Sequence, residues 1–183
     1  MSLDQEEITL QDQFEEVINS NDKLAIQEFL NNQNISDVAQ LISDNEDYET
    51  QIISILSLHR AVSTFKILDV PEQKRIIQSL PPIKTAELLN ELPADDRTAF
   101  LEELPTSVVR ELIKLLNPEE RKVTLSLLGY AEGSVGRLMT PDYIAVQEDW
   151  TVAEVLEEIR KEGKHMETID VIFVRFAVFP ATA

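Results

Sequence analysis

The sequence predicts a mostly α fold: a right-angled superhelix of short helices, an α-solenoid of about twelve-residue units, followed by a partial α/β motif. Three observations predict it. A leucine recurs every twelve residues, a proline follows five of these seven leucines within three residues, and all four glycines lie after the last of them. The recurring leucines are Leu56, Leu68, Leu80, Leu92, Leu104, Leu116 and Leu128.

Proline explains why each helix is short. It lacks an N–H and presets the helical φ, so it is accepted in the first turn of a helix. It also excludes the preceding residue, here Leu80, Leu92 or Leu104, from the α region and so ends the preceding helix. Each unit is therefore a helix of about nine residues and a corner. Isolated helices below about 12–15 residues are marginal in water, so these must stack on their neighbours.

The same spacing continues upstream as Ile18, Leu30 and Ile42, then slips by two residues before Leu56. We therefore expect one continuous superhelix of eight to ten short helices over residues 1–128. Three glycines fall within eight residues directly after it, which indicates a linker over 129–137.

The remainder, 138–183, has a different pattern. An apolar stretch at 143–146 predicts a strand, and Thr151 with Glu154 forms a capping box that opens a helix to about Lys161. A second apolar stretch at 170–174 predicts another strand. This order predicts the start of a β-α-β domain.

The formal net charge of -18 is unevenly distributed, because residues 1–50 hold thirteen acids and one base. Such a field repels nucleic acid and anionic membrane surfaces and attracts cations, although solubility alone also explains it. No apolar run approaches the roughly 18 residues of a membrane span, so we expect a soluble chain without direct membrane contact. The absence of cysteine excludes disulfides and thiolate metal sites.

The sequence does not predict an enzyme. Its two histidines, His59 and His165, have no partners at catalytic or metal-ligand spacing. The stretch 133–136 (Gly-Ser-Val-Gly) is too short for a phosphate-binding loop. No nucleophile with a base can be assembled.

Carboxylates remain as candidate ligands. Magnesium prefers oxygen ligands, keeps several waters and needs one or two direct carboxylates, which adjacent Asp95 and Asp96 could supply. Their position in the first turn of a helix is electrostatically poor for a cation, because the helix dipole is positive there. The alternative is that both acids only stabilise that turn.

The leucine–proline units, followed by the stretch 133–146 (GSVGRLMTPDYIAV), resemble the cytosolic region of MgtE-type magnesium transporters. In that family a superhelical N domain leads into a tandem CBS pair, a connecting helix and a membrane pore. Residues 136–141 and 151–156 resemble the opening of a first CBS motif. The resemblance implies an N domain at 1–128, a linker at 129–137, and an incomplete CBS motif with an atypical C-terminal tail at 138–183.

The resemblance also implies a function. Cytosolic Mg²⁺ would bridge acids of the N domain to the CBS domains and connecting helix and hold the pore closed. The partners would be the protein's own CBS and transmembrane domains in a homodimer, on the cytoplasmic side of the cell membrane. Asp95 matches an acidic family position, whereas Ala99 and Ser63 stand where the family has further acids.

Two other functions compete with this one. The first is a helical-repeat interaction scaffold resembling the flagellar motor switch protein, which would share the short helices. That protein has no counterpart of the Met-Thr-Pro stretch at 139–141 that begins the strand. A nucleotide-sensing CBS protein is disfavoured, because only about 45 residues remain for a CBS pair.

Overall fold

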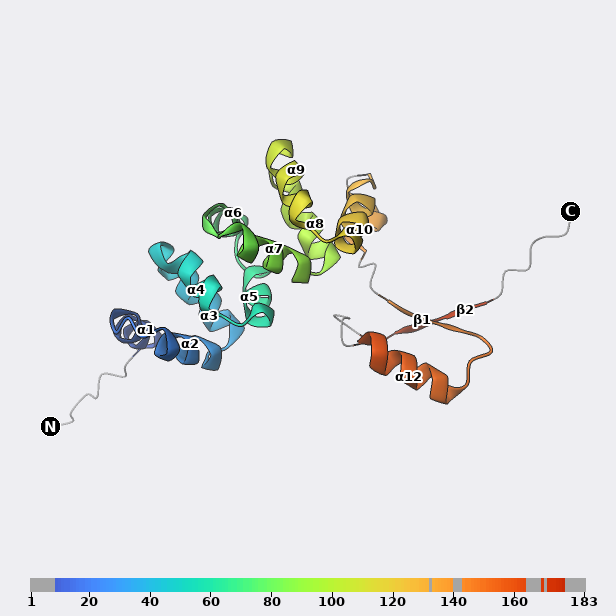
Figure 1. Cartoon of the computed structure of the whole chain (residues 1–183), viewed down its shortest axis with the longest axis horizontal. Helices are drawn as coiled ribbons and strands as arrows, with labels where there is room; N and C mark the ends of the chain where they lie inside the picture. The colour runs from blue at the N-terminus through green and yellow to red at the C-terminus, as the bar shows by residue number, and fades with distance from the viewer. Residues whose placement is uncertain (1–8, 132, 140–142, 164–168, 170, 177–183) are drawn as a thin grey trace, which may run out of the picture.

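The computed structural model describes residues 9–131, 133–139, 143–163, 169 and 171–176. Within them, ten short α-helices and one 3-10 turn run in an arc from the N-terminus, followed by α11 (Val135–Leu138) (Figure 1). The helices of the arc are α1 (Leu10–Asn19), α2 (Lys23–Asn32), α3 (Ile35–Asp44), η1 (Glu46–Tyr48), α4 (Glu49–Ile55), α5 (Leu58–Phe65), α6 (Val70–Ser79), α7 (Pro82–Glu91), α8 (Ala94–Glu102), α9 (Thr106–Leu115) and α10 (Pro118–Leu128). The predicted α-solenoid is confirmed.

Most helices of the arc pack against their next-but-one neighbour. The odd-numbered helices α3, α5, α7 and α9 form one row, while α2, α4 and α6, and then α8 and α10, pack in the same way. Successive short helices turn a corner and therefore alternate between the two rows. The sequence repeats every twelve residues, but the packing repeats every two units.

The recurring leucines mark the corners. Leu56, Leu80, Leu92 and Leu116 are the C-cap residues of α4, α6, α7 and α9, all with extended backbone and all buried. Leu68 is also buried, whereas Leu104 is half-buried. Helices α5 and α8 instead have C-cap residues with right-handed helical backbone, Lys66 and Glu103. Leu68 and Leu104 therefore follow the C-cap residue and do not occupy its position.

The upstream continuation of the repeat is confirmed as well. Ile18, Leu30 and Ile42 are buried members of the same hydrophobic core as the recurring leucines. Phe14 joins them there, with its ring edge-on to Tyr48 at 6.0 Å between centroids. One core therefore runs through the arc from α1 to α9.

A β-α-β unit follows the arc in the chain and lies beyond its C-terminal end (Figure 1). It consists of β1 (Ile144–Gln147), α12 (Val152–Glu162) and β2 (Ile172–Arg175), with the strands parallel and Ile144 opposite Ile172. The predicted Thr151–Glu154 capping box is present. The segment 129–137, expected to be a linker, contains most of α11.

Replacing Leu92 with alanine should destabilise the protein by about 2–5 kcal/mol, because the side chain is 3% exposed and its removal leaves a cavity. Leu24→Ala, at a leucine that is 75% exposed, should change the free energy of unfolding by less than about 0.5 kcal/mol. Urea unfolding followed by circular dichroism measures both, and equal effects would contradict the buried-corner assignment.

Acid should loosen the start of α12. The Thr151 backbone N–H and hydroxyl donate to Glu154 and lower the pKa of its carboxyl below the ordinary 4.5. A lowered folded-state pKa contributes stability above pH 4.5 that is lost as pH falls through the folded value. The protection factors of the α12 amides, which compare measured exchange with the intrinsic rate at each pH, should therefore fall on acidification and fall less in Glu154→Gln, with Glu157→Gln as the control that removes an exposed carboxylate outside the cap.

Candidate functional site

Helix α8 carries the two candidate carboxylates. Leu92 and Pro93 are both extended, which sets the corner, and α8 begins at Ala94. No side chain caps this start, so Asp95 and Asp96 supply the negative charge that the dipole of the first turn favours.

The structure gives these two neighbours different environments. Asp96 Oδ2 is 2.9 Å from Lys66 Nζ, with side chains 34% and 24% exposed. Asp95 Oδ1 is buried and has no hydrogen-bond partner among the described residues. A buried acceptor without a donor costs free energy, so Asp95 is the carboxylate to which a ligand adds the most.

The described residues fit only part of a magnesium site. They contain no group of three or more histidine, cysteine, aspartate or glutamate side chains that could hold a metal ion. Magnesium needs only one or two direct carboxylates when waters complete its octahedron. Asp95 offers one such oxygen, whereas Asp96 would have to exchange Lys66 for the ion. A cation here would therefore be shared with ligands from outside the described arc.

A groove of about 260 Å³ runs along α8 beside Asp96. Its floor includes Phe65 and Phe100, whose rings meet edge-on at 5.4 Å, and its polar lining includes Lys66 and Glu103. Ala99 lines the same groove and brings no carboxylate to it. Ala99 stands where the family resemblance implied a second acid. This position therefore lies on the groove face of α8, but its side chain cannot bind a cation.

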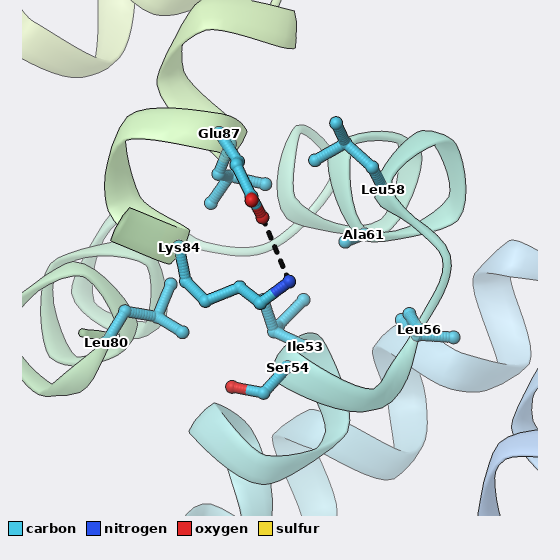
Figure 2. Close-up of a pocket in the computed structure, with 9 residues that line it drawn as sticks. Ile53, Ser54, Leu56, Leu58, Ala61, Leu80, Lys84 and Glu87 are labelled. Carbon is cyan, nitrogen blue, oxygen red and sulfur yellow. Dashed lines mark hydrogen bonds and ion pairs between the residues drawn. The ribbon is translucent and has the colours of Figure 1, made fainter. Parts of the chain in front are cut away.

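A second, smaller cavity lies between α4, α5 and α7 (Figure 2). Its volume is about 30 Å³, which is room for roughly one or two waters. Lys84 Nζ is 2.9 Å from Glu87 Oε2, and Figure 2 shows this ion pair of α7 beside apolar side chains that include Leu58 and Leu80. This cavity is a packing gap beneath a surface ion pair and too small for an organic ligand.

The remaining sequence candidates do not converge on a site. His59 is exposed on α5, and His165 lies outside the described residues. Ser63, the other position where the resemblance implied an acid, donates its hydroxyl to the His59 carbonyl at 2.9 Å. Ser134 is at the N-cap position of α11 but makes no side-chain capping bond, and this helix has only four residues, so it offers little dipole to a phosphate.

Arg97 is the residue that sequence reasoning missed. Its side chain is completely buried, pairs with Glu120, and donates to Thr124 Oγ1 at 2.8 Å. It also donates to the carbonyl oxygens of Leu89 and Leu92 at 3.0 and 2.9 Å. One arginine thus closes the C-terminal end of α7 and joins α8 to α10, and so fixes the helix that carries Asp95.

A signal for Arg97 was present in the sequence at twice the leucine period. Gln73, Arg97 and Arg121 are 24 residues apart and each is the fourth residue of its helix. Each donates to carbonyl oxygens at the end of the preceding helix: Gln73 to Phe65, Arg97 to Leu89 and Leu92, and Arg121 to Ile113, Lys114 and Leu116.

Arg97→Met should therefore cost about 3 kcal/mol of stability, because it leaves Glu120 and the two α7 carbonyls without their donor. Lys114→Met breaks an exposed ion pair with Glu111, in which the Lys114 side chain is 61% and the Glu111 side chain 69% exposed. It should lower the free energy of unfolding by about 0–1 kcal/mol. Urea unfolding of both variants measures the difference. Equal losses would show that the buried arginine is dispensable.

Together these features define an α-solenoid that is joined to a parallel β-α-β unit and carries two adjacent acids in the first turn of α8. Among the described residues, no helix is both long and apolar enough to cross a membrane. The family model of the MgtE intracellular N domain matches residues 33–133, which is more than half of the 183 residues. The chain belongs to this family.

Two curated relatives are magnesium transporters. The magnesium transporter MgtE of Thermus thermophilus is 42% identical over 81 residues, or 44% of this chain and 18% of the relative. The magnesium transporter MgtE of Bacillus subtilis is 22% identical over 129 residues, or 70% of this chain and 29% of the relative. The matched part of the chain thus spans less than a third of either relative.

Two solved structures share the fold. The cytosolic domain of the Mg²⁺ channel MgtE in complex with ATP superimposes with a TM-score of 0.83 at 30% identity, covering 90% of this chain and 68% of that one. The soluble part of a magnesium transporter gives a TM-score of 0.80 at 19% identity, covering 92% and 67%. Both matches extend beyond the arc into the β-α-β unit, since the arc ends at Leu128.

Proposed function

We propose that this chain is a magnesium-sensing regulatory region of a magnesium transporter or channel. In this proposal Mg²⁺ docks the helical N domain onto CBS domains and so gates a membrane pore. Membership of the MgtE N-domain family supports the proposal, as do relatives that are themselves magnesium transporters. The role is one of binding and signalling, without catalysis.

The observation that carries the proposal is the unpartnered, buried oxygen of Asp95. A divalent cation bound there and shared with a carboxylate of another domain supplies the missing partner and holds the two domains together. When the cation leaves, two carboxylates face each other across the interface and repel. The family resemblance implies the direction of this response, which is docked at high magnesium and released at low magnesium, and repulsion between the carboxylates accounts for the release.

The remaining assignments belong to the same proposal. The N domain covers 1–128, a linker 129–137, and an incomplete first CBS motif 138–183. The partners are the CBS and transmembrane domains of the same protein in a homodimer on the cytoplasmic side of the membrane. Nucleic acid is no partner, because the net charge of -18 repels it.

The second candidate function is an interaction scaffold like the helical repeats of the flagellar motor switch protein. The observation that favours it is the groove along α8, where an apolar floor lies between the charged side chains of Lys66, Asp96 and Glu103. A scaffold would use this face to bind another protein whether or not magnesium is present.

The test is a melting experiment with millimolar magnesium at constant ionic strength. Ligand at ten times its Kd stabilises the folded state by about 1.4 kcal/mol, which corresponds to a rise in Tm of about 3–6 °C for a chain of this size. We expect Asp95→Asn to remove most of this rise.

Glu119→Gln is the matched control, because Glu119 occupies the second position of α10 as Asp95 does that of α8, and it is exposed. It should keep the full rise. If both substitutions act equally, or if sodium chloride of matched ionic strength reproduces the rise, the effect is screening of the net charge and the scaffold function gains support.

A further inference from the structure

Arg137 lies at the end of the segment expected to be a free linker, yet it is attached to the helical arc. Its guanidinium donates to the carbonyl oxygens of Leu127, in the last turn of α10, at 2.9 Å and of Tyr130, two residues past that helix, at 3.1 Å. The same group pairs with Glu102, and the two side chains are only 14% and 29% exposed. One arginine thus contacts both α8 and α10.

The residues just before Arg137 are packed as well. Ser134 N–H donates to Ala131 O at 3.1 Å, and Arg137 N–H donates to Ser134 O at 3.0 Å. Gly136 lies so close to the Tyr130 ring that an added Cβ would come within 2.8 Å of it. Gly133 has φ of +72°, a conformation that glycine adopts at no steric cost. We call residues 133–137 the cap segment.

The cap segment repeats the device found inside the arc. Arg97 and Arg121 each donate to the carbonyls that end the preceding helix, and Arg137 does the same for α10. The arc therefore continues, in its hydrogen bonding, past the boundary at 128 that the sequence predicts. The residues directly after α10 thus add a further capping unit to the arc.

Helix α8 connects this segment to the candidate cation face. Asp95 and Asp96 lie in its first turn, and Glu102, which holds Arg137, is its last residue. Since α8 has nine residues and is fixed to α10 through Arg97, a displacement of its acidic end reaches Glu102 as movement of one rigid element.

We infer that the cap segment moves as one body with the N domain, and that Arg137 is the positioning residue that sets the direction in which the chain leaves it. The part of the proposed linker from 133 to 137 is then fixed to the N domain, and any pivot toward the β-α-β unit lies after Arg137. This inference does not require magnesium binding, and it is tested without the ion.

Pairs of spin labels can test it directly, because the sequence contains no cysteine. Ser107→Cys on α9 and Val135→Cys in the cap segment place labels at two exposed positions, the second 83% exposed. Electron–electron double resonance on the full chain, without magnesium, then measures the spread of the distance between them. We expect a single narrow distribution, and at least a twofold broader one in Arg137→Met.

Glu111→Gln is the control, because it breaks an exposed pair with Lys114 on the arc and should leave the distribution narrow. If Arg137→Met does not fold, as judged by circular dichroism, Glu102→Ala takes its place and should broaden the distribution in the same way. A broad distribution in the unsubstituted chain, or one that stays narrow without the arginine–glutamate pair, would overturn the inference.

Discussion

The structure depends on one constraint, which is that helices of seven to eleven residues leave a large share of their backbone polar groups without an intrahelical partner. Each helix has four N–H groups and four carbonyl groups without an intrahelical partner. In a stacked arc many of these groups are shielded from water, so they need donors and acceptors from elsewhere. Proline removes one N–H at several helix starts, and long side chains from the following helix supply donors to the ends.

Arginine suits this role because its guanidinium presents five donors in a fixed plane. Arg97 reaches two carbonyls, a hydroxyl and a carboxylate at once, and Arg121 reaches three carbonyls. A buried arginine would be costly alone, but each of its contacts satisfies a group that the helix end would otherwise leave open. Capping and interhelical attachment are therefore the same interaction here, and they fix α8 with its acidic first turn.

The twelve-residue leucine spacing and the prolines were sufficient to predict the α-solenoid, its corners and the burial of most of the recurring leucines, although Leu104 is only half-buried. The capping box at Thr151 likewise predicted where α12 begins. The role of Arg97 could not be predicted from the sequence, because it depends on α10 lying beside α8. The 24-residue spacing can be interpreted only once the two rows of helices are known. The residues alone did not distinguish the adjacent acids Asp95 and Asp96, and only the family resemblance favoured Asp95. The structure separates them, because Asp96 pairs with Lys66 while Asp95 Oδ1 is buried without a partner among the described residues.

Alternation between two rows also restricts how such a chain can change length. Removing a single twelve-residue unit would place helices of one row against the other row at the junction, where their buried faces would no longer meet. Loss or duplication of two units together preserves the row of each helix and the match between capping side chains and carbonyls. The fold therefore tolerates the loss or gain of an even number of helices. Relatives of this chain should differ by whole helix pairs.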